Sequence, residues 1–393
     1  MKKWIAHNSI DSLSYQIEIL DGKRVNREIL DQERSVVEDT NHLEFCHGLT
    51  DLQINGYRGI DFGNPELDHV QAEAICRDLA AEGVTHFLAT VTTQSINGLT
   101  KVLSNLNRLA EESSLLRCMM LGIHLEGPYL SAEDGPRGAH PKAFCRKPDV
   151  DEFRRLQEAA GGRIVIVTLS PEYDEAPEFI ARVSEGVIVS IGHTAASPDQ
   201  IKTAVDRGAS MSTHLGNGMH KEIVRHPNYL WEQIADDRLS AGLIGEGTHL
   251  DSSVLKSIFR AKGAERCFLV SDSTLLAGKP PGLYSNSTLG DVEVTEDRRL
   301  VVAGQRKILA GAYRPLRDAM KFLLDNEIAD RQAILQLMVG NPRRILLESF
   351  DRSDWRNGFE SSFTLFEVNA DNQMEVRLTV VNDEIVFIDK SLE

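Results

Sequence analysis

The chain has 393 residues, of which 41% are hydrophobic, and its formal net charge is −16 at pH 7. This length suits one large domain with a smaller one, and the acidic balance argues against nucleic acid or an acidic membrane surface as a partner. An anionic substrate would therefore need a local cluster of basic groups. The five cysteines are odd in number and form no CxxC pair, so we expect free thiols in a reducing compartment.

The first residues, MKKWIAHNSIDSLSY, lack the apolar core of a signal peptide. No stretch is apolar over the ~18 residues that a membrane span requires. We therefore expect a cytoplasmic protein without a membrane partner. Residues 1–47 alternate like strands, as do residues 352–393, for example in FTLFEV. We predict that both chain ends together form one small β-sandwich domain, with residues 48–351 as the catalytic domain.

Eight short apolar runs alternate with amphipathic segments after Gly48, as expected of buried parallel strands and their helices. The runs cover residues 49–55, 85–93, 117–127, 163–172, 186–194, 210–217, 240–249 and 266–273. Residues 66–83 and 197–208 are typical of the helices, with Ser197 as N-cap and Gly208 after the last turn. Eight βα units predict an α/β fold, a TIM-like (β/α)8 barrel. A hairpin near 283–309 either joins the small domain or caps the barrel.

Side chains able to bind metal recur at the C-terminal ends of five predicted strands, where a (β/α)8 barrel carries its chemistry. They are His124, Glu126, His193, His214, His249 and Asp272. Two histidines with one carboxylate and an open position form a recognised catalytic zinc set. Glu126, His193 and His214 fit that set.

Each of these residues also has a purely structural interpretation. A single histidine at a strand end is more often an ordinary hydrogen-bonded residue, and Asp272 alone could cap a turn. Their recurrence at one end of the barrel favours the metal site, with Asp272 as the general base. His124 either supports a ligand from behind or is simply buried. His47 lies at the opposite end of the first strand and is excluded as a ligand.

The segments HLEGPYL, RGAHP, GHTAAS, THLGNGM, GEGTHLD, LVSDST, LAGA and NPRRIL carry a family likeness. On them the chain resembles the N-acetylglucosamine-6-phosphate deacetylase family of the amidohydrolase superfamily, over residues 48–347. The resemblance implies a homodimer that removes the acetyl group from a phosphorylated amino sugar. It implies one divalent metal per subunit, with Zn²⁺ favoured over Fe²⁺, Co²⁺ or Mn²⁺.

The resemblance also implies roles for individual residues. Glu126, His193 and His214 would bind the metal, and Asp272 and His140 would be catalytic. The implied substrate contacts are His140, Asn217, Gly218, Arg225 and His249.

The first predicted strand, DLQING, carries Gln53 and Asn55 where two-metal family members have histidines. Amides are poorer ligands than imidazole, so we interpret this pair as a vestigial second metal position and predict one metal per chain. Dihydroorotase-like members carry a bridging lysine on the fourth strand, and IVIVTLSPE has none.

Several substrate-facing segments depart from the family pattern. THLGNGM lacks the apolar residue expected after its leucine, and IGEG and NYLWEQIADDRLSAG differ as well. These departures leave open another N-acyl amino sugar or an N-acyl amino acid as substrate. A non-catalytic protein that binds an amino-sugar phosphate is the third alternative.

Overall fold

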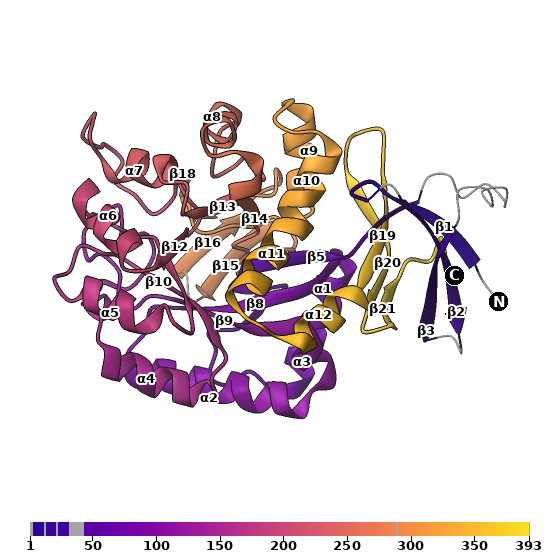
Figure 1. Ribbon diagram of the computed structural model, residues 1–393, viewed down its shortest axis with the longest axis horizontal. Coiled ribbons are helices and arrows are strands. Elements are labelled where there is room, and N and C mark those ends of the chain that lie inside the picture. Colours follow the sequence, from indigo (N-terminus) through magenta and orange to yellow (C-terminus); the bar gives the residue numbers. More distant parts are fainter. Residues whose placement is uncertain (1–2, 12, 21–22, 31–42, 288–289, 393) are drawn as a thin grey trace.

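The computed structural model describes residues 3–11, 13–20, 23–30, 43–287 and 290–392. It consists of a large barrel, a small closed sheet and a separate four-stranded sheet (Figure 1). Within the described residues, no helix combines the length and apolarity needed to cross a bilayer.

The large barrel confirms all eight predicted strands. In chain order they are β5 (Leu49–Ile54), β8 (Val84–Thr92), β9 (Met120–Glu126), β10 (Ile164–Leu169), β11 (Ile188–Ile191), β12 (Ala209–Ser212), β13 (Ser240–Ile244) and β14 (Cys267–Val270). Neighbouring strands pair in parallel in this order, and a parallel bridge from Ile54 to Ser273 links the last strand region to the first. Every residue of β9 and β10 is buried, because helices cover the outside and side chains fill the inside.

Helices surround this barrel (Figure 1). They are α1 (His69–Ala81), α2 (Ile96–Glu112), α3 (Ser114–Met119), α4 (Val150–Ala159), α5 (Ala176–Val183), α6 (Pro198–Asp206), α7 (Tyr229–Ala235), α8 (Ser252–Lys262), α9 (Asp318–Asp325), α10 (Arg331–Leu335), α11 (Asn341–Ser349) and α12 (Ser353–Glu360). Short 3-10 turns lie at Lys142–Phe144 and Ala264–Arg266, and a π-helical turn at Gln336–Gly340 joins α10 to α11.

The two helices expected from the sequence begin with capping boxes. The side chains of Asp68 and Ser197 each accept a hydrogen bond from the third helical residue, whose glutamine side chain accepts one in return from the cap. Ser197 is therefore the predicted N-cap of α6. Gly208 follows the last turn with φ +112°, a conformation that glycine adopts without strain.

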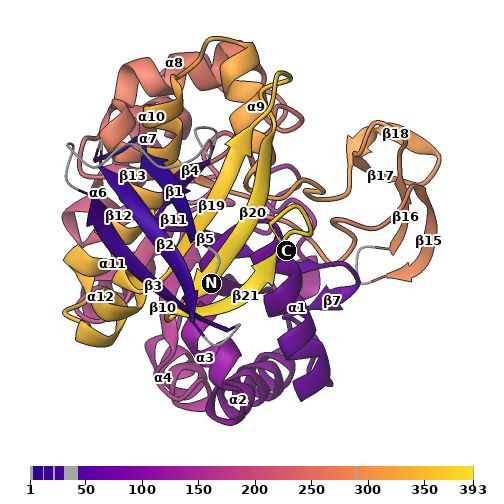
Figure 2. The ribbon, with the colours of Figure 1, turned by 90° about the vertical axis from the view of Figure 1, so that its right-hand side faces the viewer.

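Both chain ends contribute to the small closed sheet (Figure 2). Its strands are β1 (Lys3–Asn8), β2 (Ser14–Leu20), β3 (Arg24–Leu30), β4 (Glu44–Cys46), β19 (Phe363–Val368), β20 (Met374–Val381) and β21 (Glu384–Ile388). They close in the order β1-β2-β3-β21-β20-β19-β4 around an apolar core that includes Tyr15, Phe45 and Phe363. The predicted class, a TIM-like barrel with a small terminal β domain, is confirmed, although the terminal strands form one closed sheet.

The proposed boundaries at residues 47 and 352 stay a prediction. Residues 31–42 of the first segment lie outside the described residues. At the other end, Trp355 and Phe359 of α12 pack with Leu52 and Leu88 of the large barrel. The structure therefore places α12 against the barrel and begins the second terminal contribution to the small sheet at β19.

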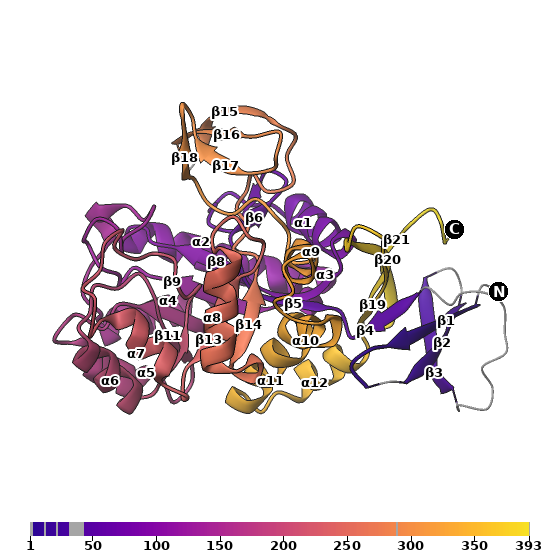
Figure 3. The same cartoon turned by 90° about the horizontal axis from the view of Figure 1, so that it is seen from above.

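The segment near 283–309 forms its own antiparallel sheet. Its strands are β15 (Gly282–Ser287), β16 (Gly290–Val294), β17 (Leu300–Val302) and β18 (Gln305–Leu309). This sheet projects from the barrel, well away from the terminal strands (Figure 3). A short ribbon of β6 (Gly56–Tyr57) and β7 (Ile60–Asp61) follows β5. Of the two predicted positions for the 283–309 segment, the one within the small domain is wrong.

Candidate metal and catalytic site

Three predicted ligands meet in the barrel mouth. Glu126 is the last residue of β9, while His193 and His214 lie two residues beyond β11 and β12. Glu126 Oε1 lies 3.1 Å from Nε2 of His193 and 3.0 Å from Nε2 of His214, and the two nitrogens are 3.0 Å apart. All three side chains are buried. This cluster can hold a metal ion.

The backbone and loops around His193 fix its ring. Nδ1 lies 2.8 Å from the carbonyl oxygen of Pro136, to which it donates, so Nε2 presents a lone pair to the cluster. A Cβ on Gly218 would lie 2.6 Å from His193 Nδ1, and one on Gly138 would lie 3.1 Å from Cε1. Both glycines have φ +56°, so no other residue type suits these positions as well. His193 itself has φ +50°, a strained conformation of the kind that occurs at functional sites.

The donor set fits a divalent cation. Because His193 carries its proton on Nδ1, its Nε2 has none. At most one proton can therefore lie between Nε2 of His193 and Nε2 of His214. The nearby carboxylate adds a negative charge in a buried setting, where an unpaired ion is costly. Burial alone would raise the pKa of Glu126, but the imidazoles of His193 and His214 against its carboxylate hold that pKa well below the usual value. Two imidazoles and a carboxylate that stays ionised are suitable ligands for Zn²⁺ and similar ions.

Asp272 lies beside this cluster, two residues beyond β14, and is held by two amides, one from Gln53 in β5 and one from Asn55 just after it. Asn55 Nδ2 donates to Asp272 Oδ1 at 2.7 Å, and Gln53 Nε2 donates to the same oxygen at 3.1 Å. Gln53 Nε2 also lies 3.2 Å from Glu126 Oε1. Burial, followed by the negative charge of Glu126, raises the pKa of Asp272 to about 6. The carboxyl group can therefore exchange a proton near neutral pH.

A cavity of about 360 Å³ opens over the cluster. It is lined by Glu126, His193, His214 and Asp272 and by the predicted substrate residues His140, Asn217, Gly218 and His249. Nε2 of His140 lies 3.2 Å from Nε2 of His193, and Nδ1 lies 2.9 Å from the Thr93 hydroxyl. Burial and the neighbouring His193 lower the pKa of His140 to about 3, so this imidazole is neutral. His249 is oriented by a 2.7 Å hydrogen bond to Glu246.

No protein-family model matches the chain. An N-acetylglucosamine-6-phosphate deacetylase from Bacillus subtilis is 33% identical over 353 residues, which cover 88% of this chain and 85% of that protein. The chain belongs to this deacetylase family. The enzyme of the same name from Homo sapiens is 30% identical over 350 residues, covering 86% and 82% of the two chains.

Solved structures of deacetylases carry the same fold. One from Mycobacterium smegmatis, a variant in complex with N-acetyl-D-glucosamine-6-phosphate, superposes with a TM-score of 0.80 at 24% identity, over 99% of this chain and 100% of that one. One from Thermotoga maritima gives 0.78 at 24% identity, over 99% of each chain. At this identity the likeness concerns the fold alone.

Not every predicted residue of this family member reaches the cavity. Arg225 is exposed and does not line it within one chain. His124 lies deeper in the barrel, where it contacts the carbonyl oxygen of Leu52 at 3.1 Å and the hydroxyl of Thr168 at 2.7 Å. Of its two interpretations, the structure supports an ordinary buried, hydrogen-bonded residue. His47 does not line the cavity either, as expected.

Several residues of the site were missed in the sequence. Thr92, Leu275 and Leu309 line the cavity, and Pro136 orients His193 through its carbonyl oxygen. Thr92 ends β8, so its position at a strand end was a usable signal. No side-chain pattern marks a carbonyl oxygen such as that of Pro136, and its role appears only once the loop is folded.

Proposed function

We propose that the protein is a metal-dependent amidohydrolase that removes the acetyl group from N-acetylglucosamine 6-phosphate, giving glucosamine 6-phosphate and acetate. The observation that carries this proposal is the buried Glu126, His193 and His214 cluster with Asp272 in the same cavity. Relatives up to 33% identical that carry the deacetylase name support the choice of substrate.

One divalent metal per chain would be held by Glu126, His193 and His214. When bound, such an ion polarises the substrate carbonyl and lowers the pKa of water. We propose Zn²⁺, with Fe²⁺, Co²⁺ or Mn²⁺ as alternatives that the same donors accept. Gln53 and Asn55 present amide N–H groups to Asp272, so this vestigial position repels a second cation.

Asp272 would act first as a base and then as an acid. Its carboxylate takes a proton from the attacking water as the new C–O bond forms. It then returns that proton to the amine nitrogen as the C–N bond breaks, so acetate and the amino sugar leave with no net change at Asp272. Since both amides hold Oδ1, the second carboxylate oxygen is the one that carries the proton.

The remaining cavity residues would bind the substrate. His140 sits beside the cluster, where its imidazole can donate to the developing oxyanion. We assign Asn217 and Gly218 to the sugar and His249 to the phosphate. Arg225 lies outside its own cavity, and a homodimer in which it reaches the partner's phosphate would use its bidentate geometry.

The location proposed for this enzyme is the cytoplasm. Its five cysteines are free thiols in the structure, which suits a reducing compartment.

Acetate release from N-acetylglucosamine 6-phosphate tests the proposal. We expect activity that a chelator removes and added Zn²⁺ restores. We expect Asp272→Asn to reduce kcat by roughly a thousandfold, because an amide cannot accept the water proton. Asp199→Asn is the matched control, since Asp199 has a side chain that is 95% exposed. If the metal-loaded protein released no acetate from this compound, the proposed substrate would be wrong.

A second candidate keeps the chemistry and changes the substrate to another N-acyl amino sugar or an N-acyl amino acid. The altered loop after His214 favours it, because Gly216 has φ +94° and a Cβ there would lie 2.9 Å from Leu250 Cδ2, so the loop follows a path that suits glycine. Comparing phosphorylated with unphosphorylated compounds separates the candidates. Preference for an unphosphorylated compound would support the second. Tight binding of an amino-sugar phosphate by metal-free protein without turnover would support the non-catalytic alternative.

A further inference from the structure

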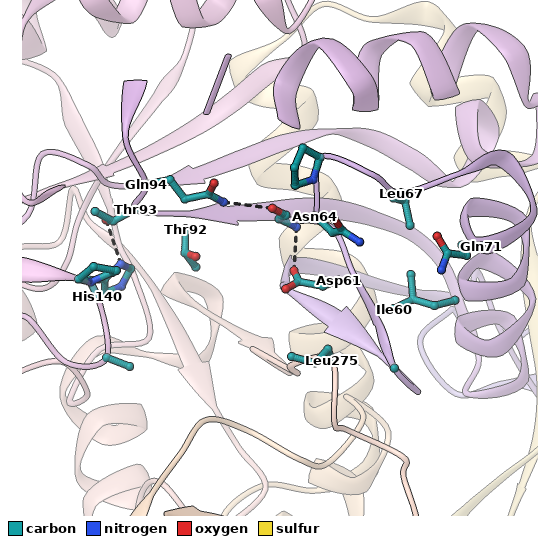
Figure 4. A pocket seen from close by; sticks show the side chains of 15 residues that line it. Ile60, Asp61, Asn64, Leu67, Gln71, Thr92, Thr93, Gln94, His140 and Leu275 are labelled. Carbon is teal, nitrogen blue, oxygen red and sulfur yellow. Dashed lines mark hydrogen bonds between the residues drawn. The ribbon is translucent and has the colours of Figure 1, made fainter. Parts of the chain in front are cut away.

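A second cavity opens next to the catalytic one, and none of the assigned roles uses it. Its volume is about 610 Å³, and it runs from His140 to Gln71 at the start of α1 (Figure 4). The two cavities share five lining residues: Asp61, Thr92, Ala139, His140 and Leu275. The second cavity, here called the side pocket, is therefore an extension of the active site. An acetyl methyl group needs a volume of only ~30 Å³, similar to that of one water molecule, so acetate release does not account for this space.

The walls of the side pocket are braced by hydrogen bonds. Asp61 Oδ1 accepts from the backbone N–H of Gly63 at 2.7 Å, and Gln94 Nε2 donates to the carbonyl oxygen of Gly63 at 3.1 Å (Figure 4). Gly98 donates its backbone N–H to Ser95 at the N-cap of α2, which fixes the chain just after Gln94. These contacts fix the loop that follows β7 against the end of β8. The pocket is therefore formed before any ligand enters.

The chemistry of the walls selects an uncharged polar group. Amide, hydroxyl and carboxylate side chains from Asn64, Gln94, Thr92 and Asp61 face apolar surface from Ile60 and Leu275. Among the residues that the structure describes, no lysine or arginine lines the pocket. A phosphate would therefore lie next to the Asp61 carboxylate, in a chain whose net charge is already −16. Hydroxyl groups, which both donate and accept, suit these walls.

Topology places the side pocket on the acyl side of the reacting amide. Thr92 ends β8, whereas Asn217 and Gly218, the proposed sugar contacts, follow β12. These two strands are four places apart in the ring of eight and so lie on opposite sides of the barrel. A substrate with its sugar on the β12 side and its amide at the metal cluster directs its acyl group toward β8.

We propose that the side pocket is an acyl subsite, and that the enzyme also cleaves uncharged, hydroxylated N-acyl groups of three or more carbon atoms. This inference rests on the proposed function, because it uses the same amide position and the same sugar contacts. His140, Thr92 and Leu275 form the boundary that such an acyl chain crosses to reach Asn64 and Gln94.

The test compares glucosamine 6-phosphate carrying three acyl groups: acetyl, 3-hydroxypropanoyl and butanoyl. The last two have the same number of non-hydrogen atoms and differ only in a terminal hydroxyl or methyl. Release of the amine product is measured in every case with the metal-loaded protein. We expect kcat/KM for the 3-hydroxypropanoyl compound to lie within about tenfold of the acetyl compound and about fivefold above the butanoyl compound, as one hydrogen bond to the pocket would give.

A pocket-filling variant localises the effect. Asn64→Trp should lower the ratio of 3-hydroxypropanoyl to acetyl kcat/KM by about tenfold, since an indole in the pocket crowds the longer chain. Val70→Trp is the matched control, because Val70 lies on α1, is 75% exposed and does not line the pocket. The control should leave the ratio unchanged.

Three results would overturn the inference while leaving the proposed function standing. The first is a 3-hydroxypropanoyl compound cleaved a thousandfold more slowly than the acetyl one. The second is a ratio that Asn64→Trp does not change. The third is an Asn64→Trp variant that loses its preference for phosphorylated sugars, which would place the phosphate in the side pocket. Failure to release amine from any of the three compounds would instead overturn the proposed function, and the acyl subsite with it.

Discussion

Gln53 and Asn55, which were predicted to form a vestigial second metal position, contact Asp272 in the structure. The amides of Gln53 and Asn55 both donate to one oxygen of Asp272. A donor stabilises the charged form of a carboxyl group, so these contacts oppose the effects of burial and of Glu126 on its pKa. The same amides orient the carboxylate toward the cluster. We infer that they are positioning residues for the proposed base.

The contribution of Asn55 can be measured in the pH profile. Activity should rise with pH as Asp272 ionises, because a base must be deprotonated. Asn55→Ala removes the 2.7 Å hydrogen bond, which raises the pKa of Asp272 and should shift the acid limb of kcat upward by about one pH unit. KM should change less than kcat. Asn357→Ala, at an exposed position on α12, is the control. An acid limb at the same pH in both variants would contradict the positioning role.

At the scale of elements, strand positions were predictable and loop contributions were not. Strands such as β9 and β10 are buried throughout and mostly apolar, so their runs stand out in the sequence, and the C-terminal end of each run marks the barrel mouth. That rule located Glu126, His193, His214 and Asp272. It could not locate the glycines that flank His193, since they come from loops whose path depends on the whole fold.

The join between the last and first barrel strands depends on a side chain. The described residues of β14 and β5 form no regular ladder, and the bridge from Ile54 to Ser273 lies beyond β14. Near the join, Asp51 Oδ1 accepts the backbone N–H groups of Ser271 and Gln53, both at 3.2 Å. Burial raises the pKa of Asp51 to about 7. The hydrogen-bond geometry therefore matters more here than the charge.

Two substitutions at Asp51 separate geometry from charge. Asp51→Asn keeps an acceptor oxygen and should leave the free energy of unfolding nearly unchanged. Asp51→Ala leaves the Ser271 N–H buried without its partner, which costs roughly 1–3 kcal/mol. Asp51→Ala should also lower kcat, because the proposed base, Asp272, directly follows Ser271 in the chain. Denaturant unfolding and steady-state kinetics of the two variants provide the comparison. Equal stability of the two variants would show that the backbone pairs without help from Asp51.

At the scale of the whole molecule, the large barrel and the small closed sheet meet around Arg343 of α11. Its guanidinium donates to the carbonyl oxygens of His47 and Phe359 and stacks on the Phe359 ring, 4.6 Å from the ring centroid. His47 joins β4 of the small sheet to β5 of the large barrel. This junction could not be predicted from the sequence, because Arg343 lies almost 300 residues from His47 along the chain. The segment around Arg343, NPRRIL, does not indicate that the arginine contacts His47.

The junction should make the protein sensitive to acid. Burial, and then the charge of Arg343, lower the pKa of His47 to about 4 from its ordinary value of 6.5. The unfolded chain therefore binds a proton at His47 at a higher pH than the folded one does. The stability of the folded state is unaffected by this group above about pH 6.5, falls as the pH drops toward 4 and levels off below that.

His47→Gln isolates this effect from other buried groups. Asp51 and Asp272 titrate in the same range with the opposite sign, because their raised pKa values stabilise the folded protein as the pH falls. The difference in unfolding free energy between wild type and His47→Gln cancels them. We expect the wild type to lose up to about 3 kcal/mol relative to the variant between pH 6.5 and 4, as 2.5 pKa units imply. A difference independent of pH would show that His47 has the same pKa in the folded and unfolded chain, and that burial beside Arg343 does not lower it.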